Sequence, residues 1–221
     1  MLDINLYVFD LDGTLLDTAP DFFKAVNTLR ENHGYGPSDF DEVRSRVSQG
    51  AGSLAEYALD LRSDQHQEIE NSRQELLNIY KNCCIDETSL FKGIEEVLVT
   101  LNGSKKKWGI VTNKPRLFAE PIVKEKIALF GPTFLICPDD VGERKPSPKG
   151  LEFACEKTQI SPENTLYVGD HLIDIQAGKA AKMRTVAAAY GYIPSGDNVA
   201  SWKADFIIND PCELINIIKN H

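Results

Sequence analysis

The chain has 221 residues, of which 42% are hydrophobic and 26% charged, so it can bury the core of one large domain or of two smaller ones. Acidic residues outnumber basic ones by 33 to 24, the net charge is -9, and Lys105 to Lys107 form the one short basic run. This balance argues against a nucleic acid or an anionic membrane as a partner.

The cysteines and the apolar segments bear on the compartment. The five cysteines are odd in number and lack metal-ligand spacing, and Cys137 and Cys155 lie in apolar stretches, which is typical of a reducing compartment. No positive segment followed by a long apolar stretch precedes Asp10, and no apolar run approaches the roughly 18 residues that span a bilayer. We therefore expect a cytoplasmic protein.

Short apolar runs rich in β-branched and aromatic residues recur along the chain and predict buried strands. In chain order they are Leu6 to Phe9, Trp108 to Thr112, Phe134 to Cys137, Thr165 to Val168, Thr185 to Ala189 and Phe206 to Ile208. Helical patterns lie between them, at residues 93–102, 116–129, 149–158, 173–182 and 211–219. This alternation predicts an α/β fold with a Rossmann-like parallel sheet covered on both faces.

One long segment breaks the alternation. From Thr18 to about Thr88 the chain has helix-compatible patterns and no convincing strand. Gln49 and Gly50 begin a glycine-containing turn between two of these helical patterns, where backbone amides can approach another surface closely. We expect a helical insert at residues 18–88 after the first strand, and a core formed by residues 1–17 and 89–221.

Polar residues follow four of the predicted strands, and ligands of open α/β sheets bind beyond the carboxyl ends of the strands. They are Asp10, Asp12 and Thr14; Thr112, Asn113 and Lys114; Lys145; and Asp170, His171 and Asp174. The sequence therefore predicts one site that combines several acids with two lysines, a hydroxyl and an amide.

Two carboxylates that leave one strand end at Asp10 and Asp12 repel each other unless a cation lies between them or one holds a proton. Mg²⁺ meets that need because it takes oxygen ligands, here Asp10, the backbone carbonyl of Asp12, and Asp170. Asp174, one helical turn after Asp170, is placed to bind the ion through water or to orient the other ligands.

Phosphate oxygens are the natural partners of the remaining groups. Lys145 can bind them with charge-assisted hydrogen bonds, and Thr112 and Asn113 with neutral ones. Together with Mg²⁺, this set of side chains predicts a phosphoryl site.

Four ordered motifs resemble those of the haloacid dehalogenase superfamily: DxDGT at 10–14, Thr112-Asn113-Lys114 after an apolar strand, Lys145-Pro146-Ser147-Pro148, and Gly169-Asp170 with Asp174. The resemblance covers nearly the full chain. The insert resembles the helical cap of the phosphoglycolate phosphatase-like branch. In that branch the turn that corresponds to Gln49 and Gly50 faces the active site.

The resemblance also implies a mechanism. Asp10 attacks phosphorus to form an aspartyl-phosphate, and Asp12 protonates the leaving alkoxide and later deprotonates the hydrolytic water. Lys145 acts with them, and Thr112, Asn113 and Lys114 belong to phosphate or substrate binding. The partner is then a small phosphorylated metabolite, and the role of His171 and the oligomeric state stay open.

Several activities compete within this superfamily. Its dehalogenases use no metal and lack the second acid, so Asp12 favours a phosphatase. A phosphosugar mutase shares the core motifs, but the His/Lys pair which that branch carries early in the cap is absent here.

Two kinds of phosphatase are resembled by segments of this chain. Thr112 to Pro115 and Tyr190 to Tyr192 resemble phosphoglycolate phosphatases, whereas residues 118–123, 135–141 and 190–198 with Trp202 also resemble N-acetylmuramic acid 6-phosphate phosphatases. We expect a phosphoglycolate phosphatase-like enzyme, with the cell-wall sugar phosphatase as the alternative.

Overall fold

The computed structural model describes residues 3–220, which divide into two compact units. Asp17–Ser89 form a helical unit, and the remaining described residues form an α/β unit. Two-residue strands, β2 (Leu16–Asp17) and β3 (Ser89–Leu90), pair where the chain passes between the units.

The α/β unit is built on a six-stranded parallel sheet with the order β5-β4-β1-β6-β7-β8. The strands are β1 (Leu6–Phe9), β4 (Lys107–Val111), β5 (Leu135–Ile136), β6 (Thr165–Gly169), β7 (Arg184–Ala188) and β8 (Phe206–Ile208). Every predicted strand therefore forms, with its ends shifted by at most about two residues. The α/β class with a Rossmann-like sheet is confirmed.

Burial explains why these segments become central strands. All four residues of β1 are buried, and β6 is buried along its whole length, as is typical of parallel strands with helices on both faces. Val8 pairs with Gly109 of β4 on one side and with Tyr167 of β6 on the other. The end of β1 consequently lies between the ends of β4 and β6.

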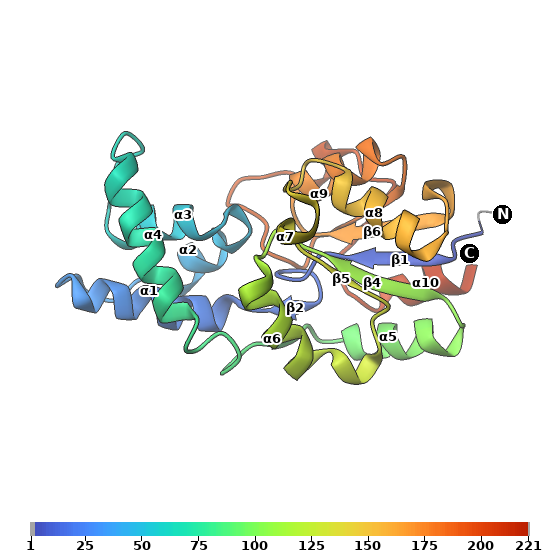
Figure 1. Cartoon of the computed structure of the whole chain (residues 1–221), viewed down its shortest axis with the longest axis horizontal. Coiled ribbons are helices and arrows are strands. Elements are labelled where there is room, and N and C mark those ends of the chain that lie inside the picture. Colours follow the sequence, from blue (N-terminus) through green and yellow to red (C-terminus); the bar gives the residue numbers. More distant parts are fainter. Residues whose placement is uncertain (1–2, 221) are drawn as a thin grey trace. The chain divides into compact units, whose positions relative to one another are not determined.

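Helices cover both faces of this sheet. They are α5 (Ile94–Gly103), α6 (Arg116–Lys126), α7 (Pro138–Val141), α8 (Lys149–Thr158), α9 (Leu172–Ala180) and α10 (Glu213–Asn220), with 3₁₀ turns at Ala128–Phe130, Pro162–Asn164 and Val199–Trp202. α8 and α9 lie on one face, and α5 and α10 on the other (Figure 1). A buried apolar cluster that includes Leu6, Val8, Leu151 and Ala177 joins the first pair to the sheet.

The helical unit contains α1 (Ala19–Asn32), α2 (Phe40–Arg44), α3 (Ala51–Ala58) and α4 (His66–Tyr80), with a 3₁₀ turn at Val47–Gln49. Phe22 of α1 and Tyr80 of α4 stack with ring centroids 3.9 Å apart. At the start of α1 the buried carboxylate of Asp21 accepts hydrogen bonds from the backbone N–H of Glu87 (2.9 Å) and Thr88 (3.0 Å) and from the Thr88 hydroxyl (2.7 Å). These bonds tie the end of the unit to its first helix.

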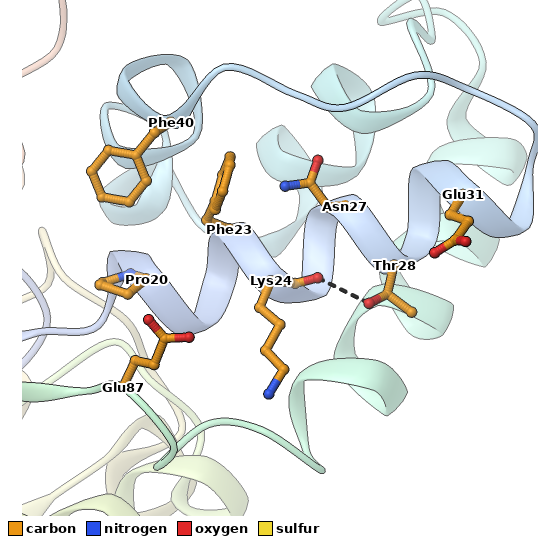
Figure 2. Close-up of a pocket in the computed structure, with 8 residues that line it drawn as sticks. All are labelled: Pro20, Phe23, Lys24, Asn27, Thr28, Glu31, Phe40 and Glu87. Carbon is orange, nitrogen blue, oxygen red and sulfur yellow. Dashed lines mark hydrogen bonds between the residues drawn. The ribbon is translucent and has the colours of Figure 1, made fainter.

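A groove of about 630 Å³ runs along the exposed side of α1. Figure 2 shows Phe23 and Phe40 together at one end, with Lys24, Thr28 and Glu31 following along the helix. The two phenylalanine rings meet edge to face, with centroids 5.3 Å apart. None of the groove's lining residues is one that the sequence singled out for chemistry, so the groove is distinct from the turn at Gln49 and Gly50.

Candidate active site

The carboxyl ends of the central strands bring four ionisable side chains together. Asp10 follows β1, Asp170 follows β6, Asp174 lies in the first turn of α9, and Lys145 comes from the loop after α7. Asp170 and Asp174 are fully buried, and Asp10 and Lys145 expose only 8% and 7% of their surface. Buried charges in a folded protein have to be paired or to bind an ion.

Lys145 forms the centre of the group. Its Nζ lies 2.8 Å from Asp10 Oδ1 and 2.7 Å from Asp174 Oδ1, and it donates a hydrogen bond to the Tyr167 hydroxyl at 2.9 Å. Burial disfavours the ammonium, but the carboxylates of Asp10 and Asp174 outweigh it, so the pKa of Lys145 is raised. Lys145 therefore carries its positive charge at physiological pH.

The acids carry more negative charge than one lysine can balance. Burial raises the pKa of Asp10 to about 6, with Lys145 opposing the rise and Asp174 adding to it. Burial, Asp174 and Asp10 together raise the pKa of Asp170 to about 8, although Asp170 accepts hydrogen bonds from the Tyr192 N–H and the Thr14 hydroxyl, each at 2.9 Å. A further cation would relieve this repulsion.

Three glycines shape the space around these carboxylates. A Cβ on Gly13, which has φ +79°, would lie 2.1 Å from Asp170 Oδ2, and one on Gly191 would lie 2.3 Å from Asp170 Cβ. A Cβ on Gly169 would lie 2.4 Å from Asp174 Cβ. The walls beside both acids are therefore backbone, and no side chain can be added there without displacing them.

The residues present fit a hard divalent cation. Carboxylate oxygens of Asp10, Asp170 and Asp174 lie within 4.8 Å of one another. Asp10 Oδ1 is buried and has no hydrogen-bond partner of suitable geometry among residues 3–220, although the Lys145 ammonium lies close to it. An all-oxygen set of this kind suits Mg²⁺ rather than a metal that prefers sulfur or nitrogen ligands.

Asp174 is the most heavily engaged of the three acids. Its Oδ1 accepts hydrogen bonds from Lys145 and Tyr167, and its Oδ2 accepts the backbone N–H of His171 at 3.0 Å. The oxygens of Asp174 already have protein donors, and its predicted role, to orient other groups or to bind the ion through water, stays a prediction.

The side chains of the motif after β4 make contacts that the sequence did not predict. The side-chain amide of Asn113 holds the Lys145 backbone at both its N–H (2.8 Å) and its carbonyl (3.1 Å). Lys114 Nζ pairs with Asp12 Oδ1 at 2.9 Å, and the Lys114 N–H donates to the Thr112 hydroxyl. Asn113 and Lys114 thus contact neighbouring protein groups, and their predicted role in binding phosphate or substrate stays a prediction.

Gln49 and Gly50 belong to the helical unit, at the turn that leads into α3. Gly50 has φ +93° and caps the helix, and the Gln49 side chain donates to the Ser45 carbonyl and accepts from the Ser53 hydroxyl. Both residues are exposed. Their predicted role toward the substrate stays a prediction.

Comparison with known proteins agrees with this geometry. Residues 7–188 match the family described as haloacid dehalogenase-like hydrolase. The chain belongs to the haloacid dehalogenase-like hydrolases. The resemblance inferred from the four motifs is thereby confirmed.

Relatives in this family carry two names. The chain is 42% identical to an N-acetylmuramic acid 6-phosphate phosphatase of Pseudomonas aeruginosa, over 97% of this chain and 95% of that protein. It is 36% identical to a phosphoglycolate phosphatase of Xylella fastidiosa, over 92% and 88%. Among solved structures, a predicted phosphoglycolate phosphatase from Haemophilus somnus superposes with a TM-score of 0.84 at 26% identity, covering 98% of this chain and 99% of that one.

Sequence reasoning missed several residues of this haloacid dehalogenase-like site. Tyr167 looked like an ordinary core residue of a strand, and the Tyr190–Tyr192 segment was noted only as a resemblance. In the structure the Tyr190 hydroxyl donates to the Thr14 carbonyl at 2.9 Å, and Gly191 and Tyr192 close over Asp170. His171 caps α9, and its Nδ1 accepts a hydrogen bond from the Ile173 N–H.

Among the described residues, no helix is long and apolar enough to cross a membrane.

Proposed function

We propose that this phosphatase is Mg²⁺-dependent and uses Asp10 as the nucleophile toward a small phosphorylated metabolite. The observation that carries the proposal is the buried ammonium of Lys145 between Asp10 and Asp174, with Asp170 beside them at the same sheet edge. A tetrahedral phosphate dianion needs this combination of a nucleophile and concentrated positive charge, because catalysis of phosphoryl transfer is largely positioning and electrostatic stabilisation.

The proposed reaction has two steps. A carboxylate oxygen of Asp10 forms a bond to phosphorus while the bond from phosphorus to the ester oxygen breaks, and a proton from Asp12 passes to the departing alkoxide. Asp12 then takes a proton from a water molecule as that water attacks phosphorus. The bond between phosphorus and the Asp10 oxygen breaks, which releases inorganic phosphate and restores the Asp10 carboxylate. Splitting the reaction in this way replaces one difficult displacement by two easier ones.

Asp10, the carbonyl of Asp12, and Asp170 are the proposed Mg²⁺ ligands, and Asp174 orients them. The ion would neutralise charge on the phosphate oxygens. Thr14 and Tyr192 hold Asp170 in place, and Lys145 keeps its ammonium beside the nucleophile. Thr112, which is 4% exposed at the end of β4, supplies a hydroxyl to a phosphate oxygen.

Asp12 has to carry a proton in the first step, so its ion pair with Lys114 has to break during turnover. Lys114 can reach a phosphate oxygen once it leaves Asp12. We propose that Lys114 positions Asp12 before it contacts the substrate, and that Asn113 fixes the Lys145 loop beside the phosphate.

N-acetylmuramic acid 6-phosphate is the proposed physiological substrate. The sequence placed 2-phosphoglycolate first, but the identity of 42% to a phosphatase named for the sugar phosphate exceeds the 36% to one named for phosphoglycolate. 2-Phosphoglycolate is the second candidate on the strength of the latter relative. We propose that this enzyme works in the cytoplasm, because its described cysteines are free and a reducing compartment keeps thiols unpaired.

Asp10→Asn tests the mechanism. We expect kcat to fall by at least about 10³-fold because the nucleophile is lost, with the folded state retained. Asp41→Asn, at an exposed acid of α2, is the matched control and should leave kcat unchanged. Near-wild-type, Mg²⁺-dependent turnover by Asp10→Asn would rule the mechanism out.

Comparing kcat/KM for N-acetylmuramic acid 6-phosphate, 2-phosphoglycolate and a hexose 6-phosphate tests the substrate, since specificity is the ratio of these values. The release of inorganic phosphate is measured in the same reactions. Hydrolysis releases it, whereas transfer of the phosphoryl group to a second sugar hydroxyl does not. An equal kcat/KM for all three esters would contradict the substrate proposal and leave the mechanism standing.

A further inference from the structure

Tyr167 lies in the middle of β6, and its side chain reaches across the sheet to the active site. β1 separates β6 from β4 in the sheet, yet the Tyr167 hydroxyl lies 3.3 Å from the carbonyl oxygen of Val111, the last residue of β4. The ring belongs to the apolar cluster that contains Val8 and Val111, and it packs beside Gly178 of α9. The ring is thus part of the core, while the hydroxyl lies among the catalytic groups.

Two ionised groups share this hydroxyl. It accepts a hydrogen bond from Lys145 Nζ at 2.9 Å and donates one to Asp174 Oδ1 at 2.9 Å. A hydroxyl has one proton and two lone pairs, so it can make both bonds at the same time. Tyr167 therefore connects the lysine of the third motif to the acid of the fourth.

Lys145 Nζ donates hydrogen bonds to Tyr167 and Asp174 and forms an ion pair with Asp10. An ammonium has three N–H groups, and three oxygens lie around this one: Asp10 Oδ1, Asp174 Oδ1 and the Tyr167 hydroxyl. These three directions fix the ammonium beside the nucleophilic carboxylate. Without the hydroxyl, one N–H would lose its acceptor inside the protein, and the ammonium could turn or move away from Asp10.

We propose that Tyr167 is a positioning residue for phosphoryl transfer, whose hydroxyl holds Lys145 against Asp10 and fixes the carboxylate of Asp174. This role rests on the proposed function, because it matters to catalysis only if Asp10 is the nucleophile. The Tyr167 hydroxyl contacts Lys145, Asp174 and the Val111 carbonyl. It acts through Lys145 and Asp174, so its loss changes the rate of the chemical step more than the binding of the ester.

A second tyrosine of the same sheet provides a matched control. Tyr7 in β1 is also fully buried, but its hydroxyl has no hydrogen-bond partner among the described residues. Tyr7→Phe and Tyr167→Phe each remove one buried hydroxyl from a central strand and keep the ring. The two changes differ in whether that hydroxyl contacts the catalytic groups.

The experiment measures kcat and KM of the full-length protein with Mg²⁺ and p-nitrophenyl phosphate for wild type, Tyr167→Phe, Tyr7→Phe and Asp10→Asn. Tyr167→Phe is expected to lower kcat about 10- to 100-fold while KM stays within about threefold, because a small displacement of a catalytic group reduces the rate strongly. Tyr7→Phe is expected to stay within about twofold of wild type in both constants, since its hydroxyl contributes no contact. Thermal unfolding with Mg²⁺ present monitors the folded state.

Each other outcome overturns the proposal. A kcat of Tyr167→Phe close to wild type would show that Lys145 needs no third acceptor. An equal loss in both Phe variants, or failure of Tyr167→Phe to fold, would make the hydroxyl a stabilising group rather than a positioning one. Activity in Asp10→Asn would instead refute the proposed function, so the two failures are distinguishable.

Discussion

Exposed ion pairs occur in both units of the molecule, but among the described residues only the α/β unit also buries lysines together with acids. In the α/β unit, Lys145 is buried in ion pairs with Asp10 and Asp174, and the buried Asp170 has a carboxylate oxygen within 4.8 Å of theirs. In the helical unit, the ion pairs lie at the surface, as between Lys24 and Asp86, whose side chains are 51% and 43% exposed. Exposed pairs of this kind contribute little to stability, whereas a buried group depends on every one of its partners.

Buried and exposed charges have different consequences for a protein. A catalytic site needs desolvated charges, because electrostatic interactions are stronger away from water. Surface pairs can change without disturbing a core. Asp21 is the exception in the helical unit, as a fully buried carboxylate with three hydrogen-bond donors.

Replacing Lys145 with methionine gives the largest expected effect. Three buried acids then lose their cation, and we expect kcat to fall about 10²–10³-fold and stability in EDTA at neutral pH to drop by about 3–5 kcal/mol. Lys24→Met, the matched change in the helical unit, should leave the melting temperature within about 1 °C of wild type. Equal losses of stability in the two variants would remove the distinction between the units.

Asp21→Ala probes the buried acid of the helical unit. It leaves two backbone N–H groups and the Thr88 hydroxyl without their acceptor, so we expect a loss of about 2–4 kcal/mol, from the penalty for unsatisfied buried donors. Urea unfolding with Asp41→Ala as an exposed control measures it. A loss no larger than that of the control would mean that water replaces the carboxylate freely.

The metal-free protein should become less stable as the pH rises. Burial and the neighbouring carboxylates of Asp174 and Asp10 raise the pKa of Asp170 from 3.8 to about 8. Between these values the folded state holds a proton that the unfolded chain has released, so stability falls with increasing pH, by roughly 2–3 kcal/mol from about pH 6 to 8.

Melting temperatures in EDTA check this dependence, and Asp170→Asn should flatten it. Because Mg²⁺ binds the ionised carboxylates, it should stabilise the wild type more at the higher pH. A metal-free stability that rises over this interval would contradict the assigned charge repulsion.

Gln49→Ala tests whether the helical unit selects the substrate. We expect the ratio of kcat/KM for N-acetylmuramic acid 6-phosphate to that for p-nitrophenyl phosphate to change by about tenfold, the effect of one lost hydrogen bond. Ser63→Ala, at an exposed loop position of the same unit, serves for comparison. Equal losses on both esters would exclude a role for Gln49 in selectivity.

The elements of the fold follow from apolar periodicity. Leu6 to Phe9 and Phe206 to Ile208 were predicted with the bounds they have as β1 and β8, because buried parallel strands are continuous apolar runs. The two-residue strands β2 and β3 and the single-turn helix α7 were not predicted. Segments so short carry no periodic signal and depend on tertiary contacts.

The meeting of Asp10, Lys145, Asp170 and Asp174 could also be anticipated, since strand order places strand ends together. The direction in which each side chain points within that site could not be anticipated from the sequence. Lys114 points to Asp12, and Asn113 holds the Lys145 loop, because local backbone geometry sets these contacts. Tyr167 was hidden because a tyrosine in an apolar strand has the pattern of a core residue, and only its hydroxyl reaches the site.

The glycines around Asp170 and Asp174 have a consequence for mutational tolerance. Gly191 lies outside the four motifs, yet a methyl group there would overlap Asp170 and the carbonyl of Gly13. Saturation mutagenesis under selection for activity should therefore recover only glycine at position 191, as narrowly as it recovers aspartate at position 170. A position without a side chain can thus restrict the evolution of this enzyme as strictly as a ligand does.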